Sequence, residues 1–297
     1  MKRNIALVLS SGGARGLAHI GVIEELEKAG FNITSIAGSS IGALIGGIYA
    51  TGNLKEFKEW VSGFSRMDMI RMMDFAISKR GFIKGDRVFR EIRNFIGDKR
   101  IEDLPIPYAA IAADIEKHRE VVFESGSLVD AIRASVSIPT IFFPWKVNDT
   151  VLIDGGMINP LPLNRVKRTD GDLLVAVNLN AAIPYEKPAD FANEKKVHSR
   201  FARVKQNLNR RWNKFFLNGN EASEKRTGFF DLLTGSFALM QDKISEYERE
   251  RYRPDVLLEI SRHASDTLEF YKAKEMIEAG RMAFDRHKKS LHQEASE

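Results

Sequence analysis

Residues 4–50 read NIALVLSSGGARGLAHIGVIEELEKAGFNITSIAGSSIGALIGGIYA, and this stretch decides the fold. Two short apolar runs, residues 4–9 and 33–37, are each followed by a turn containing glycine. Segments with helical periodicity then follow at residues 17–29 and 41–50. Strand, helix, strand and helix joined by short links are typical of a parallel sheet covered by helices. This stretch therefore predicts an α/β fold.

The rest of the chain extends the pattern. Further strands are expected at residues 108–113, 120–123, 151–153, 173–179 and 255–260, and helices at 128–135 and 273–288. We expect one α/β domain over residues 1–297, with a central, mostly parallel sheet and helices on both faces. Its core would comprise approximately residues 4–183 and 254–290, with a lid-like, basic helical insertion at approximately 184–253.

The composition excludes several classes of protein. The 297 residues carry 45 Lys and Arg against 40 Asp and Glu, which gives a mild net charge of +5, and 43% of them are hydrophobic. This balance is ordinary for a folded soluble protein and argues against a wholesale nucleic-acid binder. The absence of cysteine excludes disulfide bridges, thiolate zinc sites and a cysteine nucleophile.

Two stretches imitate membrane-targeting signals. The apolar run at residues 5–9 is too short for a signal peptide and leads into a glycine loop instead of a cleavage site. Residues 29–54 are uncharged and long enough for a membrane span, but their glycines and hydroxyl side chains favour a buried strand, turn and helix. We therefore expect a cytoplasmic protein.

The strongest local signal is the run G-S-S-I-G at residues 38–42, between an expected strand and an expected helix. This is the setting of a nucleophile elbow, a sharp turn in which Gly38 and Gly42 leave room for backbone and Ser40 stands clear of the sheet. The N–H groups that begin the next helix would face the negative charge developing on a reacting carbonyl. Such matches also arise by chance, so a glycine-rich packing turn is the alternative.

A second signal is the run S-G-G-A-R-G at residues 11–16, directly after the first strand. Gly12, Gly13 and Gly16 let backbone N–H groups converge on a phosphate or on the oxyanion of a tetrahedral intermediate. A dinucleotide site would need an acidic residue at the end of the second strand, and a Walker loop would need Gly-Lys-Ser/Thr. Neither is present, which favours an anion hole over a nucleotide cradle.

A serine nucleophile also needs a base. Asp154 follows the apolar run at residues 151–153, and Gly155 and Gly156 make room beside its carboxylate. Asp-Gly-Gly is a plain turn sequence as well, so this run alone leaves a structural turn open. The histidines are worse placed, since none falls in a strand-end loop: His19, His118, His198, His263, His287 and His292.

Together these three pieces resemble the patatin-like phospholipase family. Its pattern is a G-G-G-x-R/K-G loop, a G-x-S-x-G elbow and a later D-G-G/A, and the three occur here in that order. The run A-S-V-S-I-P at residues 134–139 is similar to the family's A-S-x-x-x-P block. The resemblance covers roughly residues 4–180 and the closing strand and helix. It implies a patatin-like three-layer sandwich and a lipid acyl hydrolase of the phospholipase A or lysophospholipase type, without metal or organic cofactor.

The resemblance also implies roles for single residues. Ser40 and Asp154 would form a catalytic dyad that works through an acyl-enzyme intermediate, without histidine. The oxyanion would be held by backbone N–H groups of Gly12, Gly13 and Ala14. The supporting residues of the loops and the elbow would be Ser11, Arg15, Gly16, Gly38, Gly42, Gly155 and Gly156. Ser11 departs from the family's usual glycine, which leaves the loop conformation open, and Arg15 either braces the loop or meets an anionic head group.

Residues 195–214 carry eight Lys and Arg and no acid, and helical spacing gathers their apolar side chains on one face. A basic face opposite an apolar one suits a helix lying in an anionic membrane interface, here the inner face of the membrane. The candidate membrane contacts are Phe201, Leu208, Trp212, Arg203, Arg210 and Arg211. Packing on the core or on a second copy in a homo-oligomer is the alternative, whereas nucleic acid is not expected.

Two alternatives to a lipid acyl hydrolase stay open. One is another acyl-transfer enzyme, namely a soluble esterase, a thioesterase or a transacylase. The other is a non-catalytic lipid-binding or partner-binding protein on the same fold, which the departure at Ser11 keeps open. Ser40 and Asp154 are both present, which favours catalysis.

Overall fold

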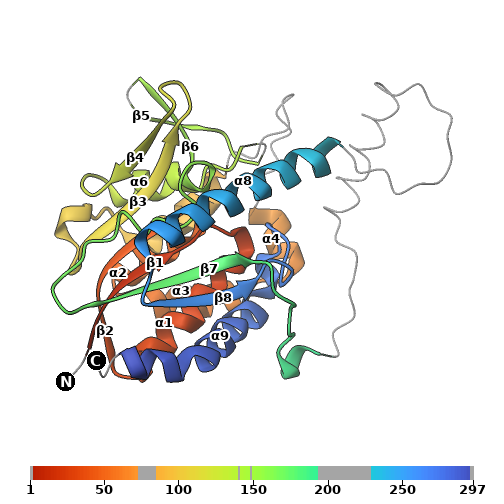
Figure 1. Ribbon diagram of the computed structural model, residues 1–297. Helices are drawn as coiled ribbons and strands as arrows, with labels where there is room; N and C mark the ends of the chain where they lie inside the picture. Colours follow the sequence, from red (N-terminus) through yellow and green to blue (C-terminus); the bar gives the residue numbers. More distant parts are fainter. Residues whose placement is uncertain (1–2, 73–84, 140, 148, 193–228, 295–297) are drawn as a thin grey trace.

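The computed structural model describes residues 3–72, 85–139, 141–147, 149–192 and 229–294. Among these residues, one sheet runs in the order β5-β6-β3-β2-β1-β7-β8, and β4 pairs with β3 (Figure 1). The strands are β1 (Arg3–Leu9), β2 (Phe31–Ser39), β3 (Tyr108–Asp114), β4 (Arg119–Phe123), β5 (Trp145–Val147), β6 (Thr150–Asp154), β7 (Leu173–Ala181) and β8 (Val256–Ser261). From β3 through β2, β1 and β7 to β8 the strands are parallel, and β4, β5 and β6 join antiparallel.

The strands and helices together confirm most of the expected elements. The helices are α1 (Ala18–Lys28), α2 (Ile41–Ala50), α3 (Leu54–Ser62), α4 (Arg66–Met72), α5 (Asp86–Ile96), α6 (Leu128–Ser135), α8 (Phe229–Tyr252) and α9 (Ala273–Glu294). The sequence did not predict β5, α3, α4 or α5. The uncharged stretch at residues 29–54 contains β2 and α2, as expected. Within the described ranges, no helix combines the length and the apolar character that crossing a membrane requires.

Alternation along β1 explains the layers. Ile5, Leu7 and Leu9 are fully buried in the large core that the sheet shares with α1, α2 and α9. Ala6 and Val8 point to the opposite face and pack with residues 161–166 and with Tyr252 of α8. In Figure 1, α1 and α9 lie below the sheet and α8 crosses above it. The result is the predicted three-layer α/β sandwich. Residues 195–214, where the sequence places a basic helix, lie outside the described residues.

One edge of β3 carries two strands in succession. Ala110 pairs with Gly38 of β2 on this edge and with Phe123 of β4 on the other. Two residues further on, Ala112 still pairs with β4 but now meets Asp154 of β6 where β2 has ended. The end of β2 and the end of β6 therefore meet at consecutive positions of β3.

The helices α1 and α9 cross with their backbones in contact. A Cβ atom added at Gly21 would lie 2.0 Å from the Ile277 carbonyl oxygen, and one at Gly280 would lie 2.0 Å from the Ala18 carbonyl oxygen. Real Cβ contacts are never this short, so both glycines are required for this crossing.

Gly280→Ala should therefore lower the free energy of unfolding by about 1–3 kcal/mol, because the added methyl group forces the helices apart. Gly235→Ala is the matched control, because Gly235 lies on α8 with open space around it. That substitution should be neutral or stabilising by up to about 1 kcal/mol, since alanine favours helix. Thermal or urea unfolding measures both variants, and equal effects would contradict the crossing described here.

Candidate active site

Ser40 occupies a strained turn between β2 and α2. Its φ is 56° and its ψ is −123°, a conformation that residues other than glycine rarely adopt. Backbone packs on backbone around it: a Cβ at Gly38 would lie 2.4 Å from the Gly42 carbonyl carbon, and one at Gly42 would lie 2.1 Å from the Leu9 carbonyl oxygen. The two flanking glycines thus allow the tight turn of a nucleophile elbow.

The hydroxyl and the amide of Ser40 are both held. The hydroxyl Oγ donates to Asp154 Oδ2 over 2.5 Å, and the amide donates to Ser135 Oγ over 2.9 Å. Ser40 and Asp154 are only 3% and 4% exposed, so little water competes for this bond. The sheet register on β3 explains why side chains 114 residues apart in the sequence meet.

Asp154 is fixed on three sides. Its second carboxylate oxygen, Oδ1, accepts the Gly156 amide over 2.7 Å, and its own amide donates to the Ser137 carbonyl over 3.0 Å. Gly155 must be glycine, because a Cβ there would lie 2.1 Å from the Ile111 carbonyl oxygen. The carboxylate therefore presents Oδ2 to Ser40 in a fixed orientation.

Burial raises the pKa of Asp154 to about 7, and the hydrogen bonds from the Ser40 hydroxyl and the Gly156 amide oppose that rise. A carboxylate with a pKa near the working pH can take up and return a proton at low cost. The pair can thus supply a nucleophile and a general base without a third residue.

His19 pairs with backbone and not with the Ser40 hydroxyl. Its Nε2 lies 3.0 Å from the Ser10 carbonyl oxygen, and burial lowers its pKa to about 4. The ring is therefore neutral near pH 7 and pairs with backbone, while the Ser40 hydroxyl pairs with Asp154.

The glycine loop after β1 forms the 3-10 turn η1 (Gly13–Leu17). Among the described residues, the Gly12 and Gly13 amides have no hydrogen-bond partner, whereas the Ala14 amide donates to the Thr267 carbonyl over 2.9 Å. Of the three N–H groups expected at an oxyanion, that of Ala14 is thus already engaged. Of these three amides, those of Gly12 and Gly13 are the ones without a partner in the described part of the chain.

Arg15 braces the loop. Its guanidinium donates to the carbonyl oxygens of Leu179 (3.0 Å), Arg262 (3.3 Å) and Ser265 (2.9 Å) and to Asn180 Oδ1 (2.9 Å). Burial lowers the pKa of Arg15 to about 10, so the side chain still carries its charge near pH 7. Of the two roles that the sequence left open, these contacts favour bracing over contact with a head group.

Ser11 packs against the Asp-Gly-Gly turn at residues 154–156. A Cβ added at Gly156 would lie 2.8 Å from Ser11 Cβ, and the buried Ser11 Oγ has no partner among the described residues. The Ser11 amide donates to the Pro160 carbonyl over 2.9 Å and points away from a role at an oxyanion. The serine that departs from the family pattern is thus accommodated by the glycine at position 156.

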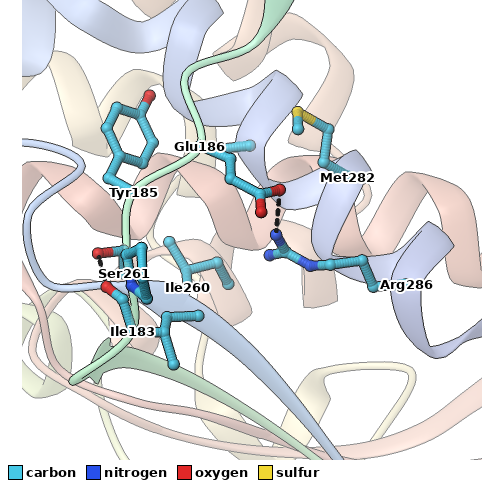
Figure 2. Close-up of a pocket in the computed structure, with 9 residues that line it drawn as sticks. Ile183, Tyr185, Glu186, Ile260, Ser261, Met282 and Arg286 are labelled. Carbon is cyan, nitrogen blue, oxygen red and sulfur yellow. Dashed lines mark hydrogen bonds and ion pairs between the residues drawn. The ribbon is translucent and has the colours of Figure 1, made fainter.

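Two recesses lie apart from the Ser40–Asp154 pair. One, between the segment after β7 and α9, holds about 10 Å³, room for about one water molecule, and is crossed by the Glu186–Arg286 ion pair (Figure 2). The other, of about 370 Å³, is lined by Ile36, Tyr108 and Lys167. Neither Ser40 nor Asp154 is among the residues that line the two recesses.

Sequence reasoning missed three residues around the pair. Ser135 and Ser137 fall in the A-S-x-x-x-P block, but this pattern did not predict their contacts with Ser40 and Asp154. Gln241 of α8, whose Nε2 donates to the Gly156 carbonyl over 2.9 Å, carried no sequence signal. The candidate membrane contacts Phe201, Leu208, Trp212, Arg203, Arg210 and Arg211 lie outside the described residues.

Comparison with known proteins relates this geometry to a family. The sequence model of the patatin-like phospholipases matches residues 7–166, a range that includes Ser40 and Asp154. An uncharacterized NTE family protein of Mycobacterium tuberculosis is 43% identical over 178 residues, which cover 60% of this chain and 49% of that protein. The chain thus spans about half the length of these mycobacterial relatives.

Lysophospholipase NTE1 of Yarrowia lipolytica is 35% identical over 185 residues, which cover 60% of this chain and 13% of that protein. Among solved structures, VipD of Legionella pneumophila aligns with 96% of this chain and 67% of its own, at a TM-score of 0.46 and 15% identity.

The raised pKa of Asp154 predicts a pH-dependent cost to stability. The folded protein binds this proton more tightly than the unfolded chain, so the contribution is full below about pH 4 and is lost as the pH rises through about 7. Asp154→Asn cannot ionise. Between pH 5 and pH 8, the free energy of unfolding of the wild type should therefore fall by about 2–3 kcal/mol relative to the variant. Urea unfolding at both pH values measures this, and a constant difference would contradict the raised pKa.

Proposed function

The chain belongs to the patatin-like phospholipase family, and from this premise we propose that it hydrolyses the carboxylic esters of phospholipids or lysophospholipids. The observation that carries the proposal is the 2.5 Å hydrogen bond from Ser40 Oγ to Asp154 Oδ2 at a strained strand-to-helix turn. The name of the Yarrowia relative supports lysophospholipids as substrates.

In the first half of the reaction, Ser40 Oγ attacks the ester carbonyl carbon while its proton passes to Asp154 Oδ2. The carbonyl oxygen becomes an oxyanion, which the free amides of Gly12 and Gly13 stabilise. The tetrahedral intermediate then breaks its bond to the alcohol oxygen. The departing alcohol takes the proton from Asp154, and the acyl group stays on Ser40.

In the second half, water replaces the alcohol. Asp154 accepts a proton from the attacking water, whose oxygen bonds to the acyl carbon. The second tetrahedral intermediate releases Ser40 Oγ, which takes the proton back from Asp154, and the free carboxylic acid leaves. A base with a pKa near 7 suits both proton transfers.

A lipid hydrolase must also reach its substrate in a membrane, and we propose that the insertion at residues 184–253 supplies this contact as a lid. Residues 195–214 offer eight basic side chains to anionic lipid head groups. On α8, within the same insertion, Leu232, Leu239 and Met240 are each more than half exposed. Exposed apolar side chains and a basic segment within one insertion suit the interface of an anionic membrane.

The dyad predicts which variants lose activity. Ser40→Ala should abolish both labelling by a fluorophosphonate probe and lysophospholipid hydrolysis, because the attacking oxygen is gone. Asp154→Asn should lower both by about 100-fold or more, because it removes the general base.

Ser39→Ala is the matched control. Ser39 is the neighbouring buried serine, and its hydroxyl has no hydrogen-bond partner among the described residues. This variant should keep both activities within about twofold, since it leaves the dyad intact. Undiminished labelling of folded Asp154→Asn would refute the dyad, and labelling lost in Ser39→Ala alone would place the nucleophile there.

The membrane contact predicts a loss of vesicle binding when basic charge is removed from the insertion. A triple variant with glutamine at positions 203, 210 and 211 should bind vesicles of anionic phospholipid about 100-fold more weakly at low salt, since each basic residue contributes about 1 kcal/mol. A control variant with glutamine in place of the exposed Lys55, Lys99 and Lys117 has the same net charge. Co-sedimentation measures both, and equal binding by the two variants would disprove the proposed contact.

A further inference from the structure

The helix α8 touches the loop that carries the proposed base. Gln241, near the middle of α8, directs its side-chain amide into the turn η3 (Gly155–Met157) and donates from Nε2 to the Gly156 carbonyl over 2.9 Å. In Figure 1, α8 crosses the sheet, and Gln241 connects this outer layer to the Asp-Gly-Gly turn.

Gly156 connects Gln241 to the carboxylate. Its carbonyl accepts the bond from Gln241, and its amide donates to Asp154 Oδ1 over 2.7 Å. The residue is closely packed, because a Cβ at this position would lie 2.9 Å from Gln241 Nε2 and 2.8 Å from Ser11 Cβ. A side chain that holds Gly156 therefore also orients the amide that Asp154 uses.

The neighbouring residue anchors α8 independently. Asp242 Oδ2 accepts from Arg262 over 2.7 Å, and a second nitrogen of Arg262 donates to the Asn180 carbonyl over 2.6 Å. Asn180 in turn donates from Nδ2 to the Ser11 carbonyl over 2.9 Å. Adjacent residues of α8 thus reach both the base and the loop of the free amides, which fixes Gln241 in place.

We propose that Gln241 is a positioning residue for Asp154, acting through Gly156. This role rests on the proposed function, in which Asp154 is the general base. Without the Gln241 donor, the turn at Gly156 is less restrained. The hydrogen bond from the Gly156 amide to the Asp154 carboxylate is then weakened.

The expected direction of the change follows from that bond. The Gly156 amide lowers the pKa of Asp154, so a weaker bond lets the pKa rise further. The base then stays protonated to higher pH. The charged groups on neighbouring elements are engaged with other partners: Arg133 with Ser137, Asp114 with Arg119, Asp242 with Arg262, and Arg15 with carbonyl oxygens; His19 is neutral.

The test is Gln241→Met in the full chain, a substitution that keeps the length of the side chain and removes the donor. Hydrolysis of a soluble p-nitrophenyl ester is followed from pH 5.5 to 9. The acidic limb of kcat/KM should move up by about half a pH unit or more, which corresponds to about a threefold loss of activity at pH 6. KM should stay within about twofold, and the loss should disappear above about pH 8.5.

Lys243→Met is the matched control, because it places the same side chain two residues further along α8 at a mostly exposed position. It should behave as the wild type. Gln241→Glu, which also lacks the donor, should shift the limb in the same direction and serves as the second variant if Gln241→Met does not fold.

The two failures can be told apart. A wild-type protein without Ser40-dependent hydrolysis overturns the proposed function and this role with it. If the wild type is active and the Gln241 variants show the same acidic limb of the kcat/KM profile, this result overturns the positioning role alone. So does a loss that is equal at every pH or that follows a lowered melting temperature, since either marks a merely structural contact.

Discussion

The hydrogen bonds along one edge of β3 are the constraint on which the site depends. β2 occupies the first part of this edge and β6 the next, so the last residues of two strands meet at consecutive positions. Neither strand could slip by one residue without moving Ser40 or Asp154 to the wrong face of the sheet. The antiparallel strands β4 and β5 flank β3 and β6 and hold this register from the other sides.

Within this rigid frame lies a carboxylate whose charge is costly to bury. Asp154 is almost fully buried, and two hydrogen bonds offset only part of the cost of burying its charge. Ser40 adds backbone strain at a positive φ. Surrounding contacts hold both in place: glycines at positions 38, 42 and 155 allow backbone to approach within contact distance, and Ser135 accepts the Ser40 amide. The strain and the buried charge lower the stability of the fold, and burial leaves Asp154 with a pKa near 7.

Local patterns in the sequence predicted the parts that local chemistry determines. Alternating and helical periodicities predicted β1, α1, β2, α2 and the later strands, because burial imposes those periods. The motifs also singled out Ser40 and Asp154, which the structure brings into contact, since only a few residue types fit such turns. The antiparallel pairing of β5 and the contact of Gln241 with Gly156 depend on segments far apart in the chain, and no local pattern records them. The engaged amide of Ala14 escaped prediction for the same reason, because its partner Thr267 lies more than 250 residues away.

The glycine loop after β1 depends on residues that lie far along the chain, beyond β8. Thr267 accepts the Ala14 amide, Arg262 and Ser265 accept from Arg15, and α9 closes against the helix that begins directly after the loop. A nascent chain therefore contains Ser40 and Asp154 before the segment that holds the Gly12–Ala14 loop has been made. In a growing chain, the loop can reach the conformation described here only after residues 262–267 and α9 have left the ribosome and docked.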